Sequence, residues 1–229
     1  MDKIFYFSGS GKSLRFSEYL SEKLSAPIFD ITKISSTEKV YADSALVVFP
    51  VYCQNLPDPV KNFLPKLHTK KVAFAALYGR KSYGNVIEDA VNLTYSEFIG
   101  GVCVPSGHSF LNEQNGFDFD ALSPFIERMN NPVPAKSEHG KKDFYADLIP
   151  AQRTRIGVKI IKKSSCDNCG KCEEDCPINA IKNGTINKNC IRCLRCVNNC
   201  PQKALEFNTL WFMKIYLENG RRNNIKFYL

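Results

Sequence analysis

The residues with the clearest chemical meaning are eight cysteines between positions 166 and 200 of this 229-residue chain. They form two runs with the same spacing, C-x-x-C-x-x-C-x-x-x-C-P, and a shift of 24 positions superimposes one run on the other. In a reducing compartment, such a density of thiols favours metal or cluster ligation over disulfide bonds. The eight are Cys166, Cys169, Cys172, Cys176, Cys190, Cys193, Cys196 and Cys200.

This spacing is typical of bacterial cysteines that bind [4Fe-4S] clusters. Three thiolates on one tight loop hold three corners of a cubane, whereas the fourth, which precedes a proline, reaches the other cluster. A domain this small then folds around its clusters instead of a large apolar core. We therefore expect two clusters, one held by Cys166, Cys169, Cys172 and Cys200 and the other by Cys190, Cys193, Cys196 and Cys176.

Structural zinc is the main alternative reading of these cysteines. Zinc sites usually use two separated C-x-x-C pairs, and three cysteines at successive three-residue intervals match that pattern poorly. The two remaining cysteines stand apart from the repeat. Cys53 is a candidate reactive thiol without an identifiable partner base, and Cys103 lies in a predicted strand and is expected in the core.

A second candidate site is the turn rich in serine and glycine that follows the apolar segment 4–7. A turn of this kind before a helix offers hydroxyls and backbone N–H groups to a phosphate at the positive end of the helix dipole. A Walker loop would need glycine in place of Tyr6, and the dinucleotide fingerprint would need glycine in place of Leu14. A tight turn with capping serines is the alternative. The turn predicts a phosphate loop formed by Ser8, Gly9, Ser10, Gly11, Lys12 and Ser13.

The elements that must position this loop alternate between strand and helix signals at the spacing of βαβ units. Five strands with intervening helices predict an open, doubly wound, five-stranded parallel sheet of the α/β class. Ligands in such folds bind at the carboxyl ends of the strands, where the strand order reverses, and the predicted phosphate loop lies at that edge. We expect strands at 4–7, 27–31, 45–52, 72–78 and 98–104, and helices at 12–23, 59–67, 85–95 and 121–129.

The predicted phosphate loop resembles that of flavodoxins, Ser/Thr-x-Thr-Gly-Asn-Ser/Thr after the first strand. Ser8, Gly11 and Ser13 match the pattern, Ser10 stands in for threonine, and Lys12 replaces asparagine. The resemblance implies FMN, with Lys12 able to pair with its phosphate. The loops after the third and fourth strands would flank the flavin ring through Tyr52, Asn55, Leu56, Tyr78, Gly79, Tyr83 and Gly84.

From residue 1 to about 207 the chain resembles flavodoxin-like domains fused to a two-cluster bacterial-type ferredoxin. The resemblance implies a flavodoxin-like FMN-binding domain over 1–135, a basic linker over 136–160 and a small α+β two-cluster ferredoxin domain over 161–207. A tail follows over 208–229. A connecting helix is expected within 143–163. The tail predicts a helix over 210–217 that ends at Asn219-Gly220, with its apolar face packed between the two domains.

Composition restricts the class of protein further. The net charge of +8 is concentrated in the linker, where 136–163 carries eight basic and three acidic residues, and in the tail, where 208–229 carries four and one. Basic segments of this size are more simply a solvated linker than a nucleic-acid site. The longest nearly unbroken apolar stretch spans nine residues, 45–53, so no stable membrane insertion is expected. The N-terminus does not read as a secretory signal, and a cytoplasmic location is expected.

These features predict an electron carrier that passes low-potential electrons between two [4Fe-4S] clusters and FMN, with other redox proteins as partners. An oxidoreductase is the alternative, in which the flavin reduces a small molecule with electrons from the clusters. A third possibility is that the N-terminal domain is a docking module without flavin. The donor, the acceptor and the oligomeric state do not follow from the sequence.

Overall fold

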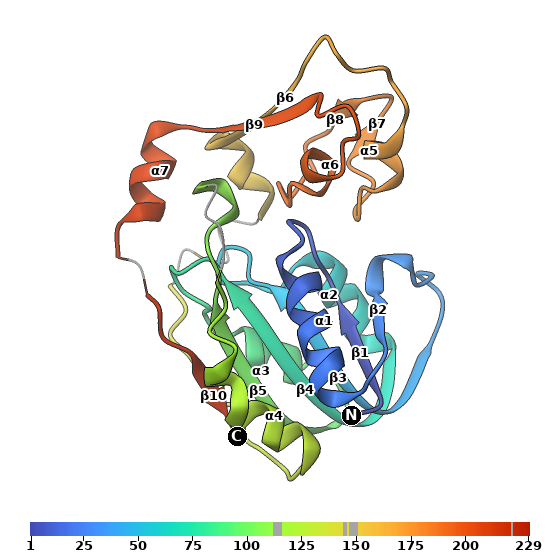
Figure 1. The fold of residues 1–229 in the computed structure, drawn as a ribbon, viewed down its shortest axis with the longest axis vertical. Coiled ribbons are helices and arrows are strands. Elements are labelled where there is room, and N and C mark those ends of the chain that lie inside the picture. The colour runs from blue at the N-terminus through green and yellow to red at the C-terminus, as the bar shows by residue number, and fades with distance from the viewer. Residues whose placement is uncertain (112–115, 144–145, 147–150, 221) are drawn as a thin grey trace.

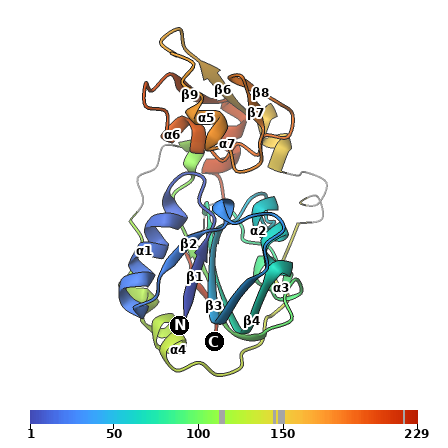
Figure 2. The ribbon, with the colours of Figure 1, turned by 90° about the vertical axis from the view of Figure 1, so that its right-hand side faces the viewer.

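The computed structural model describes residues 1–111, 116–143, 146, 151–220 and 222–229. Two parts of the chain lie one above the other, as Figures 1 and 2 show. The lower part, here called the N-terminal domain, is a sheet covered by helices and comprises residues 1–135 together with the last strand. The upper part, here called the cysteine-rich domain, comprises residues 158–209 and lies above the carboxyl ends of the parallel strands.

The N-terminal domain is built on five parallel strands in the order 2-1-3-4-5, which is the doubly wound, flavodoxin-like order. The central strands are apolar without alternation, and residues 45–49 and 72–78 are buried because helices cover both faces of the sheet. The strands are β1 (Lys3–Tyr6), β2 (Ile28–Asp30), β3 (Val40–Pro50), β4 (Leu67–Tyr78) and β5 (Glu97–Pro105).

Four helices cover this sheet and divide its core into two apolar clusters. α1 (Lys12–Leu24) and α4 (Ser123–Asn130) pack on one face, and α2 (Asp58–Phe63) and α3 (Val86–Val91) pack on the other. α2 is shorter than the predicted segment 59–67, because Pro65 lies in a following 3-10 turn, Leu64–Lys66, after which β4 begins. α3 is also shorter than predicted.

The tail returns to the N-terminal domain and adds a sixth strand that the sequence analysis did not foresee. β10 (Lys226–Tyr228) pairs antiparallel with β5, with Phe227 opposite Val102. Tyr228 is buried, and the hydroxyl of Tyr78 donates a hydrogen bond to the carbonyl of Asn224 over 2.7 Å. The chain therefore passes from the sheet to the cysteine-rich domain and back.

The cysteine-rich domain repeats its backbone as well as its sequence. Two antiparallel pairs, β6 (Val158–Lys162) with β9 (Leu205–Thr209) and β7 (Ile181–Lys182) with β8 (Thr185–Ile186), accompany two single-turn helices. The helices α5 (Lys171–Glu174) and α6 (Arg195–Asn198) lie 24 positions apart. Left-handed backbone recurs at the same shift in the pairs Asn168 and Arg192, Gly170 and Leu194, and Asn179 and Lys203.

The connecting helix expected within 143–163 is not what the described part of that segment forms. A 3-10 helix spans Ala151–Ile156, and β6 then begins at Val158. Residues 144–145 and 147–150 lie outside the described residues. The extended conformation of β6 follows from its pairing with β9, a partner distant in the sequence that helical periodicity does not reveal.

The predicted tail helix is present as α7 (Trp211–Glu218), but its apolar face is not packed between the domains as expected. Leu217 is buried and Met213 packs against Gly157, whereas Trp211 is 73% exposed and Ile215 50% exposed. A helix of two turns has room for only a narrow contact, so most of its apolar side chains face outward. No helix of the described ranges is long and apolar enough to cross a bilayer.

The last strand supplies a stability test. Truncation of the buried side chain in Tyr228→Ala should lower the free energy of unfolding by about 3 kcal/mol, because an aromatic group leaves the sheet core. Leu229→Ala is the matched control, since Leu229 is exposed, and its effect should stay within about 0.5 kcal/mol. Urea unfolding followed by circular dichroism measures both, and equal effects would show that β10 adds nothing to the sheet.

Candidate metal centres and the loop they face

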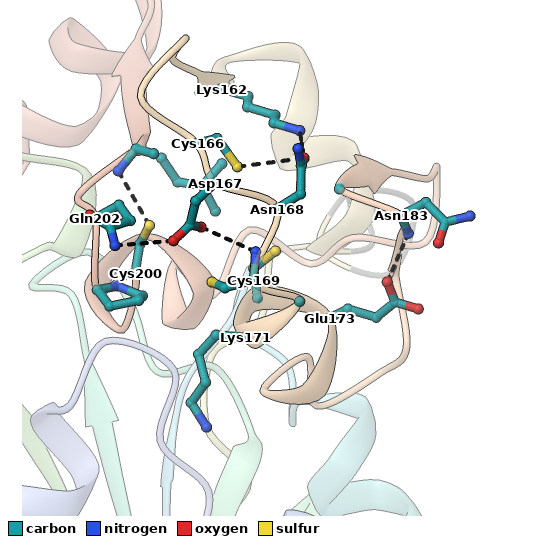
Figure 3. Close-up of a pocket in the computed structure, with 16 residues that line it drawn as sticks. Lys162, Cys166, Asp167, Asn168, Cys169, Lys171, Glu173, Asn183, Cys200 and Gln202 are labelled. Carbon is teal, nitrogen blue, oxygen red and sulfur yellow. Dashed lines mark hydrogen bonds between the residues drawn. The ribbon is translucent and has the colours of Figure 1, made fainter.

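The first cysteine set, Cys166, Cys169, Cys172 and Cys200, lines a cavity of about 300 Å³ (Figure 3). Three of its thiols come from the loop before and within α5, and the fourth comes from the other half of the repeat. Asp167 joins the two halves, because it accepts hydrogen bonds from the backbone N–H of Cys169 and from the Gln202 amide, both over 3.1 Å. Figure 3 shows this carboxylate between its two donors.

The second cysteine set, Cys176, Cys190, Cys193 and Cys196, lines a separate and much tighter void of about 10 Å³. That volume is about the size of a single water-sized probe, so a cluster in this position must move the thiols apart. Cys190 is 8% exposed and Cys196 is 7% exposed. The second set is therefore the more deeply enclosed.

Each set thus joins three cysteines of one half of the repeat to the fourth cysteine of the other half, which is the crosswise grouping that the spacing predicts. The two crossing thiols have equivalent surroundings. The sulfur of Cys176 accepts the N–H of Ala180 over 3.1 Å, and the sulfur of Cys200 accepts the N–H of Ala204 over 3.2 Å. Such bonds stabilise negative charge on sulfur. Cluster ligation by these thiols stays a prediction.

Among the described residues, no three Cys, His, Asp or Glu side chains are arranged to hold one metal ion. A cubane differs from a single ion because each of its four thiolates binds a different iron, so its ligands surround a larger volume. The cavity within the first cysteine set has that character.

Burial makes two thiols of the second cysteine set harder to deprotonate. Burial, together with the neighbouring thiols, raises the pKa of the Cys193 thiol to about 11 and that of Cys196 to about 12. Both thiols are therefore protonated at neutral pH before metal binds. Because iron binds the thiolate, cluster assembly must release these protons.

The predicted phosphate loop, residues 8–13, lies at the carboxyl end of β1 and leads into α1. In the described part of the chain, the buried Ser8 Oγ has no hydrogen-bond partner, and a Cβ placed on Gly11 would meet only open space. Gly11 has a φ of +87° and precedes the first turn of α1. The ammonium of Lys12 donates to the carbonyl of Gly107. An orphaned hydroxyl, an open glycine and a lysine at a helix start fit a phosphate group.

Gly9 of the same loop has a different neighbour from the one that the sequence indicated. A Cβ on Gly9 would lie 2.6 Å from both the Cβ and the carbonyl oxygen of Cys193. It would also lie 2.7 Å from the hydroxyl of Tyr52. Gly9 therefore allows close approach of the cysteine-rich domain. Ser10 is half-buried and Ser13 is buried.

The loop after β3 contains three of the residues that are predicted to flank a flavin ring. Tyr52 is half-buried and lies edge-on to Phe7, with ring centroids 6.3 Å apart, and burial of its hydroxyl raises the pKa of that group. The Asn55 amide donates to the carbonyls of Cys53 and Ala146, each over 3.0 Å. Leu56 is part of the core.

In the loop after β4, Tyr78 is buried and lies edge-on to Tyr83, with centroids 5.2 Å apart. Gly79 faces the ring of His108, and a Cβ on Gly84 would lie 2.6 Å from the carbonyl of Gln54. The two flanking loops thus touch each other. A flavin ring between these loops would require the contacts between them to open. The predicted phosphate loop, in contrast, already has open space and a hydroxyl that could bind a phosphate.

Sequence reasoning missed the residues that join the two domains. Arg195 pairs with Asp30 over 2.6 Å and donates to Thr32 over 2.9 Å. Asp30 ends β2 two positions before Thr32, and a carboxylate in that position commonly caps the next turn. That pattern predicts a turn but does not predict a contact with Arg195.

The crosswise grouping predicts the outcome of paired cysteine substitutions. Cys166→Ser with Cys200→Ser removes two thiols of the same set, so about half of the iron should remain. Cys166→Ser with Cys176→Ser removes two cysteines of the same half of the repeat but of different sets, so both clusters should be lost. Iron and sulfide assays of anaerobically purified variants measure this. The reverse pattern would assign each cluster to one half of the repeat.

Cluster assembly should also depend on pH. Because the pKa of the Cys193 thiol is raised to about 11 and that of Cys196 to about 12, iron competes with protons for these two thiols, and cluster occupancy should rise between about pH 7 and pH 9. Titration of the apo chain with limiting iron and sulfide, with the released protons counted, measures this rise. Cys103→Ala is the control, because Cys103 lies in the sheet core and its loss should leave the pH dependence unchanged. Occupancy independent of pH would contradict the argument.

Comparison with known proteins locates one family in the C-terminal part. Residues 159–182 match the family model described as a 4Fe-4S binding domain. This segment contains four of the eight cysteines. No curated protein matches the chain. The chain thus consists of an N-terminal α/β domain with a mostly parallel sheet, followed by a small cysteine-rich region that contains a 4Fe-4S ferredoxin-type domain.

Proposed function

We propose that this protein transfers electrons between two [4Fe-4S] clusters and an FMN, and that its partners are other redox proteins. The observation that carries the proposal is the division of eight thiols between two separate pockets, four in each, with each set drawn from both halves of the repeat. The match of residues 159–182 to a 4Fe-4S binding domain supports a redox role for the first half of the repeat.

The assignment of FMN rests on the phosphate end of the site. The predicted phosphate loop follows β1, and the strand order reverses between β1 and β3, which is where doubly wound sheets bind their ligands. The orphaned hydroxyl of Ser8 and the ammonium of Lys12 supply a donor and a positive charge for a phosphate. The start of α1 adds the positive end of its dipole.

The two kinds of group would complement each other, because a flavin holds one or two electrons and each cluster carries one. The residues of this chain bury the second cysteine set, donate N–H groups to the sulfurs of Cys176 and Cys200, and hold both domains on one polypeptide. Burial and N–H···S bonds are the means by which proteins tune cluster potentials.

The contacts of the flanking loops support a carrier over a reductase of small molecules. Gln54 links these loops, because it accepts from Ser82 over 3.2 Å and donates to Asp143 over 2.7 Å. Linker residues therefore lie against the loops that would expose a flavin ring to a substrate. A carrier needs only an electron path to its partner, whereas a reductase needs an open ring.

Cofactor content is the direct test of the proposal. Anaerobic purification should yield about eight irons and eight sulfides per chain, and one FMN. The pure protein should exchange electrons rapidly with low-potential redox proteins and show no steady turnover of quinones or nitro compounds. Stoichiometric zinc without sulfide would remove the clusters from the proposal. Absent flavin would leave the N-terminal domain as a docking module.

The role of Lys12 can be separated from that of the ring. Lys12→Gln should weaken FMN binding roughly tenfold or more, because a charge-assisted bond to phosphate is lost. Riboflavin, which lacks the phosphate, should bind both proteins equally. Lys23→Gln, in the last turn of the same helix, is the control and should change neither affinity. Fluorescence titration of the native protein and both variants with each flavin measures these affinities, and an equal loss for both flavins in Lys12→Gln would contradict phosphate recognition.

A further inference from the structure

We propose that the two cysteine sets have separate roles in electron transfer. The second cysteine set exchanges electrons with the N-terminal domain, and the first cysteine set exchanges them with external redox partners. Arg195 is the positioning residue that holds the second set against the predicted phosphate loop. This assignment deepens the proposed function and rests on it.

The contact between the two domains is made by a ligand loop of the second set. Gly9 approaches Cys193 so closely that no side chain fits between them, and the hydroxyl of Tyr52 lies beside both. Cys193 packs against the apolar core that fills one face of the parallel sheet. The second cysteine set is thus built onto the N-terminal domain.

The repeat itself has diverged where the domains meet. Ile191 corresponds to Asp167 after the 24-residue shift, and Ile178 corresponds to Gln202. Ile191 is 3% exposed and Ile178 packs with it against the core of the N-terminal domain. Asp167 and Gln202 are exposed and bind each other across the first set. The polar pair therefore marks the first cysteine set, which faces outward, and the apolar pair marks the second cysteine set, which packs against the N-terminal domain.

The same division holds for the basic residue in each single-turn helix. Arg195 corresponds to Lys171. Arg195 reaches across the interface to Asp30, with side chains only 14% and 6% exposed, and its second contact is to the Thr32 hydroxyl. Asp30 also accepts from the N–H and hydroxyl of Thr32, so its carboxylate accepts three hydrogen bonds in this largely buried ion pair. Lys171 is exposed and pairs with Glu174 and Asp175 of its own domain.

The first set has the exposure that an external partner needs. Cys169, the counterpart of Cys193, is exposed, whereas Cys193 is covered by the loop at Gly9. An electron accepted by a cluster in the first set would pass to a cluster in the second set and from there to a flavin of the N-terminal domain, or would travel the same path in reverse. In each step the donor group would lose one electron and the acceptor group would gain it, and no bond forms or breaks.

The test compares holoprotein variants at equivalent positions of the repeat. Arg195→Gln and Asp30→Asn break the interdomain pair from opposite sides, and Lys171→Gln is the matched control. Hydrogen exchange of residues 8–13 should accelerate at least tenfold in the first two variants and stay unchanged in the control. With a bulky iron chelator, half of the iron should leave the native protein quickly and half slowly. Arg195→Gln and Asp30→Asn should accelerate the slow half at least tenfold.

Internal electron transfer gives a third measurement. After rapid reduction by an external protein donor, the flavin should be reduced at least tenfold more slowly in Arg195→Gln and Asp30→Asn than in the native protein. Iron release from the native protein in a single phase would overturn the proposal. A slow phase that keeps its native rate in both interface variants would also overturn it. If the protein binds no flavin but keeps the hydrogen-exchange and iron-release pattern, the proposed function is contradicted. The packing of the second cysteine set against the N-terminal domain would still be supported.

Discussion

The exchange of the fourth cysteine between the halves of the repeat is the constraint on which the cysteine-rich domain depends. The apolar cluster at its centre consists of Ile181, Leu205 and Cys196 with a few partly buried neighbours, which is little apolar surface to hold four short strands and two single-turn helices by burial alone. Because Cys176 and Cys200 each belong to the opposite set, neither half can be completed without the other. Metal–thiolate bonds would then take the place of the missing core.

Duplication explains the symmetry of this domain, and its departures from symmetry explain how the molecule is assembled. The backbone has kept the turns on which the thiols depend, since left-handed residues recur in pairs through both loops. The side chains between the thiols were free to differ. The isoleucines and the arginine around the second cysteine set suit a protein surface, and the aspartate, glutamine and lysine around the first set suit water.

The features that the sequence predicted well depend on local patterns. The buried strand around 45–49 follows from its unbroken apolar run. The crosswise ligation indicated by the cysteine spacing and the following prolines stays a prediction. The features that it missed depend on distant partners. The sequence around Asp30 does not indicate a contact with Arg195. The short segment 226–228 does not by itself predict a strand. β6 is extended because β9 pairs with it. The outward face of α7 was misjudged because apolar side chains in a short helix suggest burial whether or not a partner surface is present.

The place of β10 has a consequence for how the protein is made. A ribosome releases the first five strands long before it releases residues 226–228, so the nascent sheet must wait with one edge of β5 open while the cysteines emerge. An open edge is prone to pair with other chains. That edge therefore closes only after residues 226–228 have emerged, and a nascent chain stalled within the cysteine repeat would expose an incomplete sheet that can pair with other chains.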